Sequence, residues 1–130
     1  MKQITVMEKY PVFTIKISND ETTYQNVDEI LSYLKEKAEA HPIATYIGMF
    51  DHYAHTSSLA EGQISDEIKD AKNFICCFGK ALPKPEVLAV RPRSIGVAQM
   101  EDGFVVSFLE APNPDANNAM EAWVKGIANR

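Results

Sequence analysis

The sequence predicts a single α+β domain over residues 1–130, with two main helices packed on one face of a mainly antiparallel sheet of five to six strands. Three observations indicate this fold: two amphipathic helical stripes, several short alternating strand patterns, and an Asp-Gly turn between two of the strands. Helices and strands with apolar faces bury those faces against each other, which favours a two-layer arrangement. A chain of 130 residues can bury a sizeable core without disulfides or metals.

The N-terminal region is expected to form strands. Residues 4–7 are typical of a short strand or lead-in, and residues 8–11 of a turn. Between Val12 and Ile17, large apolar residues alternate with Thr14 and Lys16, a pattern typical of a half-buried strand. The polar residues 18–23 then predict a turn.

The first helix follows from one apolar stripe at helical spacing. Its members are Val27, Ile30, Leu31, Leu34 and Ala38. Asn26 and Glu29 are spaced as a capping box, in which each side chain satisfies an exposed amide of the first turn. Pro42 cannot continue a helix, so we expect the end near Ala40 or His41.

The middle of the chain is expected to add two strands. One begins near Thr45, and we expect it to continue toward His55 before a loop over residues 57–63. Residues 65–68 fit a short helical turn. The apolar run Phe74–Phe78, between Asn73 and Gly79, favours a buried central strand.

The last third predicts a hairpin and a helix. Residues 87–100, broken near Pro92, and residues 104–110 flank an Asp-Gly turn, in which we expect glycine to supply a positive φ. One face of the second strand carries Phe104, Val106 and Phe108 and is expected to lie on the core. Asn113-Pro114 predicts a helix start. The helix's apolar stripe comprises Ala116, Ala119, Met120, Trp123 and Ile127.

Charge and composition exclude several classes of protein. A net charge of −5 argues against nucleic-acid binding, because phosphate recognition needs a positive surface. The N-terminus lacks a secretory pattern, and no stretch approaches the ~20 apolar residues of a membrane span, so we expect a cytoplasmic protein without a membrane partner. Cys76 and Cys77 are adjacent, and neighbouring cytosolic cysteines are expected to stay reduced.

Asp51, His52 and His55 have the donor atoms of a metal site, which either cysteine could complete. If residues 51–55 continue the preceding strand, His52 and His55 face opposite sides and cannot share an ion. A helical turn would bring them together. The strand pattern favours divergence, so we predict no metal site and no cofactor.

A thiol-dependent enzyme is the second alternative. Cys76 or Cys77 could pair with His52 or His55 as nucleophile and base. The flanking residues are apolar, however, and burial raises a thiol pKa and makes cysteine inert. We therefore expect structural cysteines and name no catalytic residue.

Binding of a small ligand or a partner protein requires less machinery, namely an aromatic-lined cleft with a few polar groups. The aromatic candidates are Tyr10, Tyr24, Tyr33, Tyr46, Tyr53 and Trp123. Arg91 and Arg93 could bind a carboxylate or phosphate, or else could pair with Glu110 or Asp102. We place the expected cleft at the end of the strand near His52 and Tyr53, together with Arg91 or Arg93.

Self-association is a third hypothesis. The second face of the hairpin carries Ala98, Met100, Val105 and Leu109, with Ser107 as its polar member. Apolar residues on both faces of a hairpin indicate a sheet covered on both sides, by helices or by another subunit. A homodimer, with or without a ligand, is therefore expected.

The run MEKYPVFTIKI, the helix after it, and ATYIGMFDHY resemble the first half of GyrI-like effector-binding domains. The resemblance implies a small α+β protein that binds small molecules or partner proteins in a cleft on its sheet. After Phe78 the chain departs from that pattern, with one hairpin and one helix where the family repeats strand, helix and hairpin. The stretch from Val87 to Pro114 resembles the tails of small bacterial domains of unknown function, and no site residue is carried over.

Overall fold

The computed structural model describes all residues, 1–130, and contains one antiparallel sheet with helices, as the sequence predicted. The six strands lie in the order β1-β2-β6-β5-β4-β3, and every neighbouring pair is antiparallel. They are β1 (Lys2–Val6), β2 (Tyr10–Ser18), β3 (Thr45–Phe50), β4 (Asp70–Cys77), β5 (Arg93–Gln99) and β6 (Gly103–Leu109). The helices are α1 (Val27–Ala40), α2 (His52–Ser58) and α3 (Pro114–Lys125), with 3-10 segments η1 (Asn19–Glu21) and η2 (Pro85–Val90).

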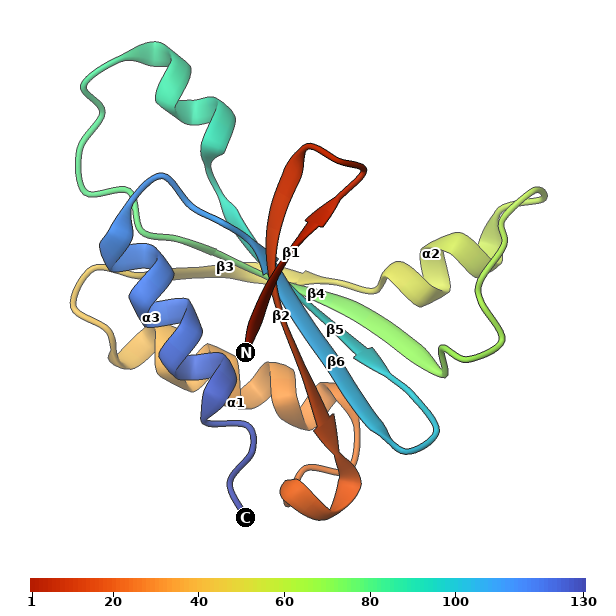
Figure 1. Ribbon diagram of the computed structural model, residues 1–130. Coiled ribbons are helices and arrows are strands. Elements are labelled where there is room, and N and C mark those ends of the chain that lie inside the picture. The colour runs from red at the N-terminus through yellow and green to blue at the C-terminus, as the bar shows by residue number, and fades with distance from the viewer.

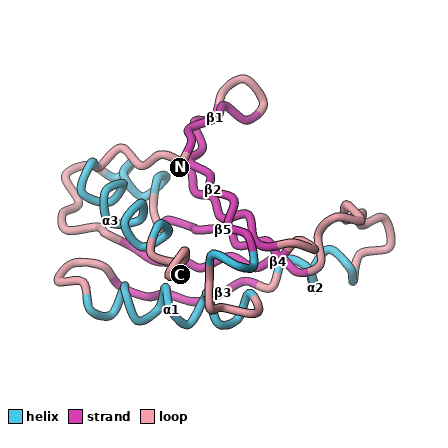
Figure 2. The backbone as a smooth tube through the Cα atoms, turned by 60° about the horizontal axis from the view of Figure 1, so that its bottom comes forward, coloured by secondary structure: helices cyan, strands magenta, loops and turns pink.

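The two long helices lie together on one face of the sheet (Figure 1). Turning the molecule shows the same layering, with α2 and the loop after it projecting from the far end of the sheet (Figure 2). The β1–β2 hairpin also projects, as does the segment that contains η2. No helix combines the length and the apolarity that crossing a bilayer requires.

Both long helices begin at the residues that the sequence indicated. The side chain of Asn26 accepts a hydrogen bond from the Glu29 amide at 2.9 Å, and α1 ends at Ala40 before His41. The side chain of Asn113 accepts one from the Asp115 amide at 2.9 Å, with Pro114 in the first helical position. These side chains satisfy amides that have no partner within a helix, which fixes where each helix starts.

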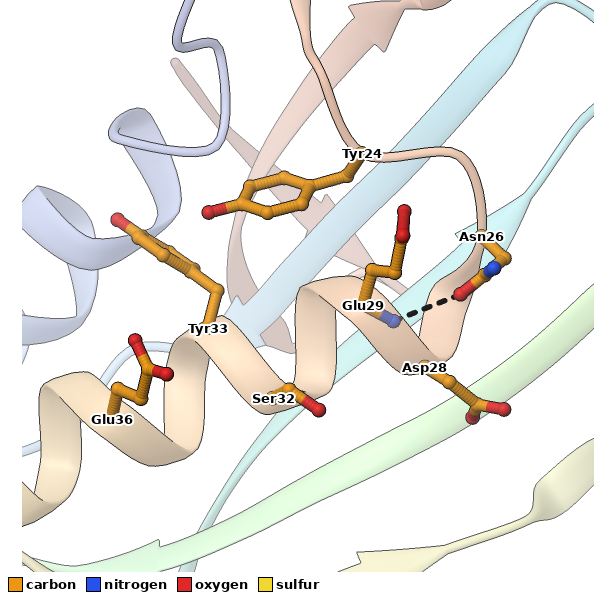
Figure 3. Close-up of a pocket in the computed structure, with 7 residues that line it drawn as sticks. All are labelled: Tyr24, Asn26, Asp28, Glu29, Ser32, Tyr33 and Glu36. Carbon is orange, nitrogen blue, oxygen red and sulfur yellow. Dashed lines mark hydrogen bonds between the residues drawn. The ribbon is translucent and has the colours of Figure 1, made fainter.

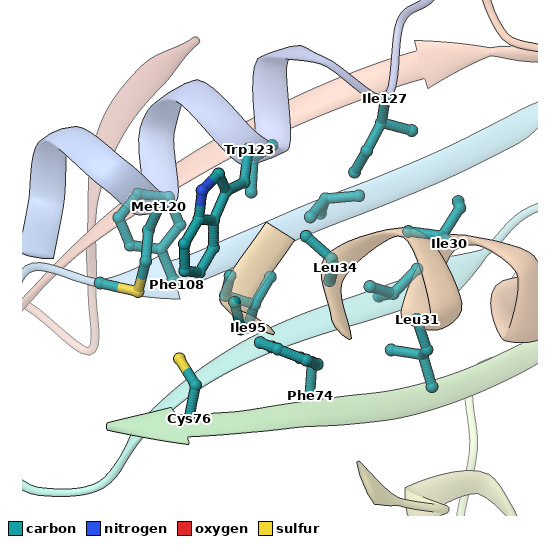
Figure 4. Packing of buried hydrophobic residues seen from close by; sticks show 14 of the residues in the cluster. Ile30, Leu31, Leu34, Phe74, Cys76, Ile95, Phe108, Met120, Trp123 and Ile127 are labelled. Atoms are coloured by element: carbon teal, nitrogen blue, oxygen red, sulfur yellow. The ribbon is translucent and has the colours of Figure 1, made fainter. Parts of the chain in front are cut away.

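The core fills the space between the sheet and the two long helices (Figure 4). Both predicted stripes are buried there, apart from the half-buried Ala119. The sheet contributes buried side chains from β2, β4, β5 and β6, including Ile17, Phe74, Ile95 and Phe104 with its two predicted companions on β6. Each fully buried side chain of this size contributes about 1.5–3 kcal/mol to folding, so this layer supplies most of the stabilisation.

The opposite face of the sheet, here called the open face, is not covered by α1 or α3. Cross-strand pairing places one row of residues across it: Lys2, Thr14, Ser107, Gly96, Asn73 and Phe50. Neighbouring rows add Ile4, Val12, Leu109, Ser94 and Ile75, and Lys16, Val105, Ala98 and Ala71. The open face therefore contains apolar, small and neutral polar residues, two lysines and no carboxylate.

The hairpin between β5 and β6 is confirmed, but the reason for its glycine differs from the prediction. No glycine in the chain has a positive φ; the positive-φ residues are Met7 and Glu8, in the turn between β1 and β2. A Cβ on Gly103 would lie 2.0 Å from the carbonyl oxygen of Ile17. Glycine is thus needed for the close approach of β2 and β6, not for backbone conformation.

Three boundaries in the middle of the chain differ from the prediction. β3 stops at Phe50, and residues 52–58 form α2 where a strand end and loop were expected. β4 begins at Asp70, earlier than the apolar run suggested. The segment before Pro92 forms η2 instead of the first part of a long strand.

Candidate functional site

Arg91 and Arg93 line one small cavity, here called the arginine cavity, at the end of the sheet where η2 meets the start of α3. Its volume is about 60 Å³. The other lining residues are Phe78, Gly79, Val87, Val90, Ala111, Pro112, Asn113 and Ala116. Four segments that are distant in sequence therefore meet here: the end of β4, η2, the start of β5 and the start of α3.

Arg93 is held by backbone carbonyls. Its Nη2 donates to the oxygens of Leu109 and Glu110 at 2.6 and 3.1 Å, and its Nη1 donates to that of Val90 at 3.1 Å. The Nε atom is buried and has no hydrogen-bond partner. Burial lowers the pKa of the guanidinium, since the charged form loses hydration.

Arg91, which also lines the cavity, is anchored in a similar way. Its Nη1 donates to the carbonyl oxygen of Ala81 at 2.8 Å. Its guanidinium lies against Gly79, where an added Cβ would come within 2.7 Å of Nη1. Gly79 leaves room for the side chain to lie flat on the backbone.

Neither arginine forms an ion pair. All ion pairs within 4.0 Å involve Lys72 or Lys125. The expected alternative, pairing with Glu110 or Asp102, does not occur, because Arg93 bonds the backbone of Glu110 and not its carboxylate. The two cations beside this cavity therefore have no carboxylate within 4.0 Å.

The start of α3 adds a further positive element to this cavity. The Ala116 amide has no acceptor, whereas the Asp115 and Asn117 amides are bonded to Asn113. The side chain of Asn117 fixes the preceding loop through two hydrogen bonds to Ala111, at 2.7 and 2.6 Å. Free amides and the helix dipole favour negative charge at a helix start.

His52 and Tyr53, the other predicted ligand residues, lie elsewhere. They line a separate hollow of about 160 Å³ with Thr56, Ile68 and Ala71. On β4, Ala71 is five residues from Cys76, the partner of Arg93, which is about 16 Å along a strand. The structure therefore divides the four predicted ligand residues between two places instead of uniting them in one cleft.

The expected divergence of His52 and His55 is wrong, because both lie on α2. Their rings are 6.2 Å apart between centroids, and each lies 5.5 Å from the ring of Phe50. Asp51 forms the N-cap, with its carboxylate accepting from the Ala54 amide at 2.9 Å. Thr56 Oγ1 lies 3.0 Å from His52 Nδ1. No group of three or more His, Cys, Asp or Glu side chains is arranged to hold a metal ion.

The cysteines do not meet the histidines. Cys76 is buried in the core beneath the helices, and burial raises the pKa of its thiol to about 12. Cys77 pairs with Thr45, whereas Phe50, just before α2, pairs with Asn73. About 13 Å of strand separates Asn73 from Cys77. The geometry does not assemble the Cys–His pair of the enzyme alternative.

An open groove of about 480 Å³ runs along α1 (Figure 3). It is lined by Tyr24, Asn26, Asp28, Glu29, Ser32, Tyr33 and Glu36. Glu29 and Asn26 serve the helix start, and the Tyr33 hydroxyl donates to the Trp123 carbonyl at 2.6 Å. Three of its polar side chains are thus occupied in holding α1 and α3, and Asp28 is paired with Lys72 of β4.

Sequence reasoning identified both arginines and the cap Asn113 but missed the contributions of Gly79 and Ala116. In the sequence, Gly79 only ends an apolar run, and Ala116 is only a core position of the last helix. Nothing in the local pattern of either residue indicates a cavity. Their role depends on β4 and α3 meeting in space, which no spacing along the chain reveals.

Fold and cavity together define a small α+β domain with an uncompensated basic cavity at one end of its sheet. The chain belongs to the family described as "Family of unknown function (DUF6858)", whose model matches residues 1–129. Searches among curated proteins and among solved structures give no match.

Proposed function

We propose that the protein is a binding domain that takes the carboxylate or phosphate group of a small ligand in the arginine cavity. The supporting observation is that two guanidinium groups line one cavity without any carboxylate partner. A cationic side chain that is partly buried and unpaired costs free energy, which a bound anion recovers. The GyrI-like resemblance of the first half implies a ligand-binding role of the same kind.

The size of the cavity limits what enters it. A volume of about 60 Å³ corresponds to about two water molecules at about 30 Å³ each. That space suits one carboxylate or phosphate group, not a whole metabolite. The rest of the ligand lies outside the cavity, on the surface formed by η2 and the neighbouring loops.

The donors suit a planar or tetrahedral anion. Three of the five N–H groups of Arg93 are bonded to carbonyls, which leaves Nε and one Nη1 hydrogen available. The Ala116 amide supplies a further donor at the start of α3. Bonds from these donors to a charged oxygen are stronger than bonds to a neutral acceptor.

The test is a titration of the 15N-labelled chain with sodium acetate and with inorganic phosphate, followed by NMR. We expect saturable shifts at the Ala116 amide and at the side-chain Nε–H of Arg93. Arg91→Gln should weaken binding about tenfold, as the loss of one charge-assisted hydrogen bond worth about 1.5 kcal/mol predicts. Gly79→Ala, which displaces the Arg91 guanidinium, should act in the same direction.

Arg130→Gln is the matched control, because Arg130 is exposed at the C-terminus and lines no part of the cavity. It should leave the titration unchanged. Equal losses in the Arg91 and Arg130 variants would show a general charge effect. Shifts that never saturate for either anion would reject the cavity as a binding site.

A homodimer formed through the open face is a second candidate. Its apolar and small residues carry no carboxylate, whereas an exposed sheet face ordinarily alternates to polar residues. Six strands at ~4.8 Å spacing and about seven residues in length span on the order of 600 Å². That area is close to the roughly 800 Å² per partner of a standard interface.

Light scattering after size exclusion tests this candidate. We expect twice the 14.5 kDa chain mass for the native protein. Val105→Lys, in the middle of the open face, should give the monomer mass. Ser32→Lys, on the exposed side of α1, should leave the mass unchanged. A native protein of monomer mass at 100 μM would contradict the candidate.

A further inference from the structure

Large apolar side chains are exposed in the segments whose backbone carbonyls bond the two arginines. Leu88, whose carbonyl accepts the Arg91 amide, is 61% exposed, and Leu82, next to the Ala81 carbonyl that Arg91 bonds, is 67% exposed. Val90 and Leu109, whose carbonyls hold Arg93, are 40% and 42% exposed. The segments whose backbone holds the two guanidinium groups therefore carry apolar side chains in contact with solvent, and Val90 also lines the arginine cavity.

The same segment is basic in a chain of net charge −5. Residues 79–93 contain Lys80, Lys84, Arg91 and Arg93, and their single acid is Glu86. None of these four cations forms an ion pair. Unpaired positive charge and exposed apolar side chains thus occur together in residues 79–93, five of which line the arginine cavity.

From this combination we infer that the ligand is an aliphatic carboxylate, a molecule with one anionic head and an unbranched apolar chain of about six carbons or more. The inference rests on the proposed function, since the head occupies the arginine cavity. The chain lies on the exposed leucines and valines outside, because the cavity itself has room for the head group alone. A small polar anion such as phosphate would leave those apolar side chains in water.

Two physical requirements are met by this class of ligand. An isolated Leu on a surface needs no explanation, but apolar side chains gathered beside unpaired cations match both parts of an amphiphile. Each methylene removed from water strengthens binding about fourfold. Three methylenes covered by Leu82, Leu88 and Val90 therefore strengthen binding on the order of fiftyfold over the head group alone.

Calorimetric titration of the full chain with acetate, octanoate and 1-octanol separates the two parts of the ligand. We expect octanoate to bind at least tenfold more tightly than acetate, and 1-octanol, which lacks the charge, to bind no better than acetate. Equal affinities for acetate and octanoate would overturn the aliphatic assignment while leaving the anion site standing. Failure of both anions to bind would remove the proposed function itself.

Substitutions on the protein surface test separately where the apolar chain of the ligand binds and where its anionic head binds. Leu88→Ser should weaken octanoate binding several-fold and leave acetate binding unchanged. Leu59→Ser is the matched control, because Leu59 is another exposed leucine, 51% exposed against 61% for Leu88, and it follows α2 and does not line the cavity. Identical octanoate affinities in the two variants would overturn the placement of the chain on η2.

Two further ligands test whether the protein binds other molecules that combine an anionic group with apolar groups. Phosphatidylglycerol vesicles present anionic heads on an apolar layer, and the dipeptide acetyl-Leu-Leu presents a free carboxylate beside apolar side chains. We expect weak or no binding of either at concentrations that saturate with octanoate. Vesicle binding without octanoate binding, or a dipeptide that binds more tightly than octanoate, would overturn the assignment to a free aliphatic acid.

Discussion

Cys76 and Cys77 are neighbours in β4, but successive residues of a strand face opposite sides of a sheet. The Cys76 side chain lies in the core, and the Cys77 side chain lies on the open face, where its sulfur accepts from the Gly79 amide at 3.3 Å. Thiolate formation is required for reaction with a disulfide reagent. Burial opposes it at Cys76, whose thiol pKa is raised to about 12, so the two thiols should differ in reactivity.

The prediction at this scale is that one thiol per chain reacts with Ellman's reagent in the native protein and two react after denaturation. Cys77→Ser should remove the native reaction, and Cys76→Ser should keep it. A native reaction at Cys76 would contradict the buried core position. Rapid reaction at both thiols in the native protein would support the alternative of a thiol-dependent enzyme.

Among the helices, α1 combines a local start signal with an apolar stripe, and the two can be separated by mutation. Its Asn26 cap is exposed, so changing the cap leaves the core untouched. The stripe residues have no exposed surface at all. The cap therefore contributes to stability through one hydrogen bond and through the place where the helix begins.

We predict that Asn26→Ala lowers the free energy of unfolding by about 1 kcal/mol, the ordinary value of an N-cap. Urea unfolding followed by circular dichroism measures the change. Asn118→Ala is the matched control, since Asn118 is exposed within α3 and makes no side-chain hydrogen bond. The control should be neutral or slightly stabilising. A loss of equal size in both variants would rule out capping as the cause.

How far the sequence predicts an element depends on whether the element carries an apolar stripe. α1 and α3 have such stripes and strong caps, and both were located to within a few residues. α2 buries none of its residues, so the periodicity that identifies a helix is missing there. Its one local signal was Asp51, whose carboxylate caps the helix, but an Asp after a strand also fits a loop.

The candidate site shows the same limit. A pair of arginines around Pro92 indicated anion recognition, but their lack of a carboxylate partner depends on which carbonyls the loops after β6 and η2 present. The separation of His52 from Arg93 follows from the strand register of β3, β4 and β5, which the chain fixes through long-range pairing. Neither property is contained in local spacing.

At the scale of the whole molecule, Lys72 connects three elements. From β4 its ammonium group bonds the Asp28 carboxylate on α1 at 2.7 Å and lies 3.8 Å from the carboxylate of Asp51, the α2 cap. The hydrogen bond to Asp28 is the main cause that raises the pKa of Lys72 above the ordinary 10.5, against a smaller opposing effect of burial. Lys72, together with Asp28 and Asp51, therefore links the sheet to α1 and to the projecting α2.

Because the folded-state pKa of Lys72 is raised, its contribution to stability is fully present below about pH 10.5 and is lost as pH rises through the folded value. We predict that Lys72→Met lowers the free energy of unfolding by up to about 1 kcal/mol at pH 7, since the pair is partly solvated. The difference from the native chain should shrink as the pH rises beyond 10.5. Lys125→Met, in the exposed pair with Glu121, is the control and should change stability less. A constant difference across this range would contradict the ionic origin.

Trp123 is the single tryptophan, and its surroundings give the molecule an internal optical reporter. Its indole stacks on Phe78, which lines the arginine cavity, with ring centroids 5.4 Å apart, and meets the His41 ring edge-on at 5.9 Å. All indole emission therefore originates at one point, between the cavity wall and the end of α1. Ligand entry and separation of the helix layer both alter that point, so the intensity and wavelength of emission follow both events without any attached dye.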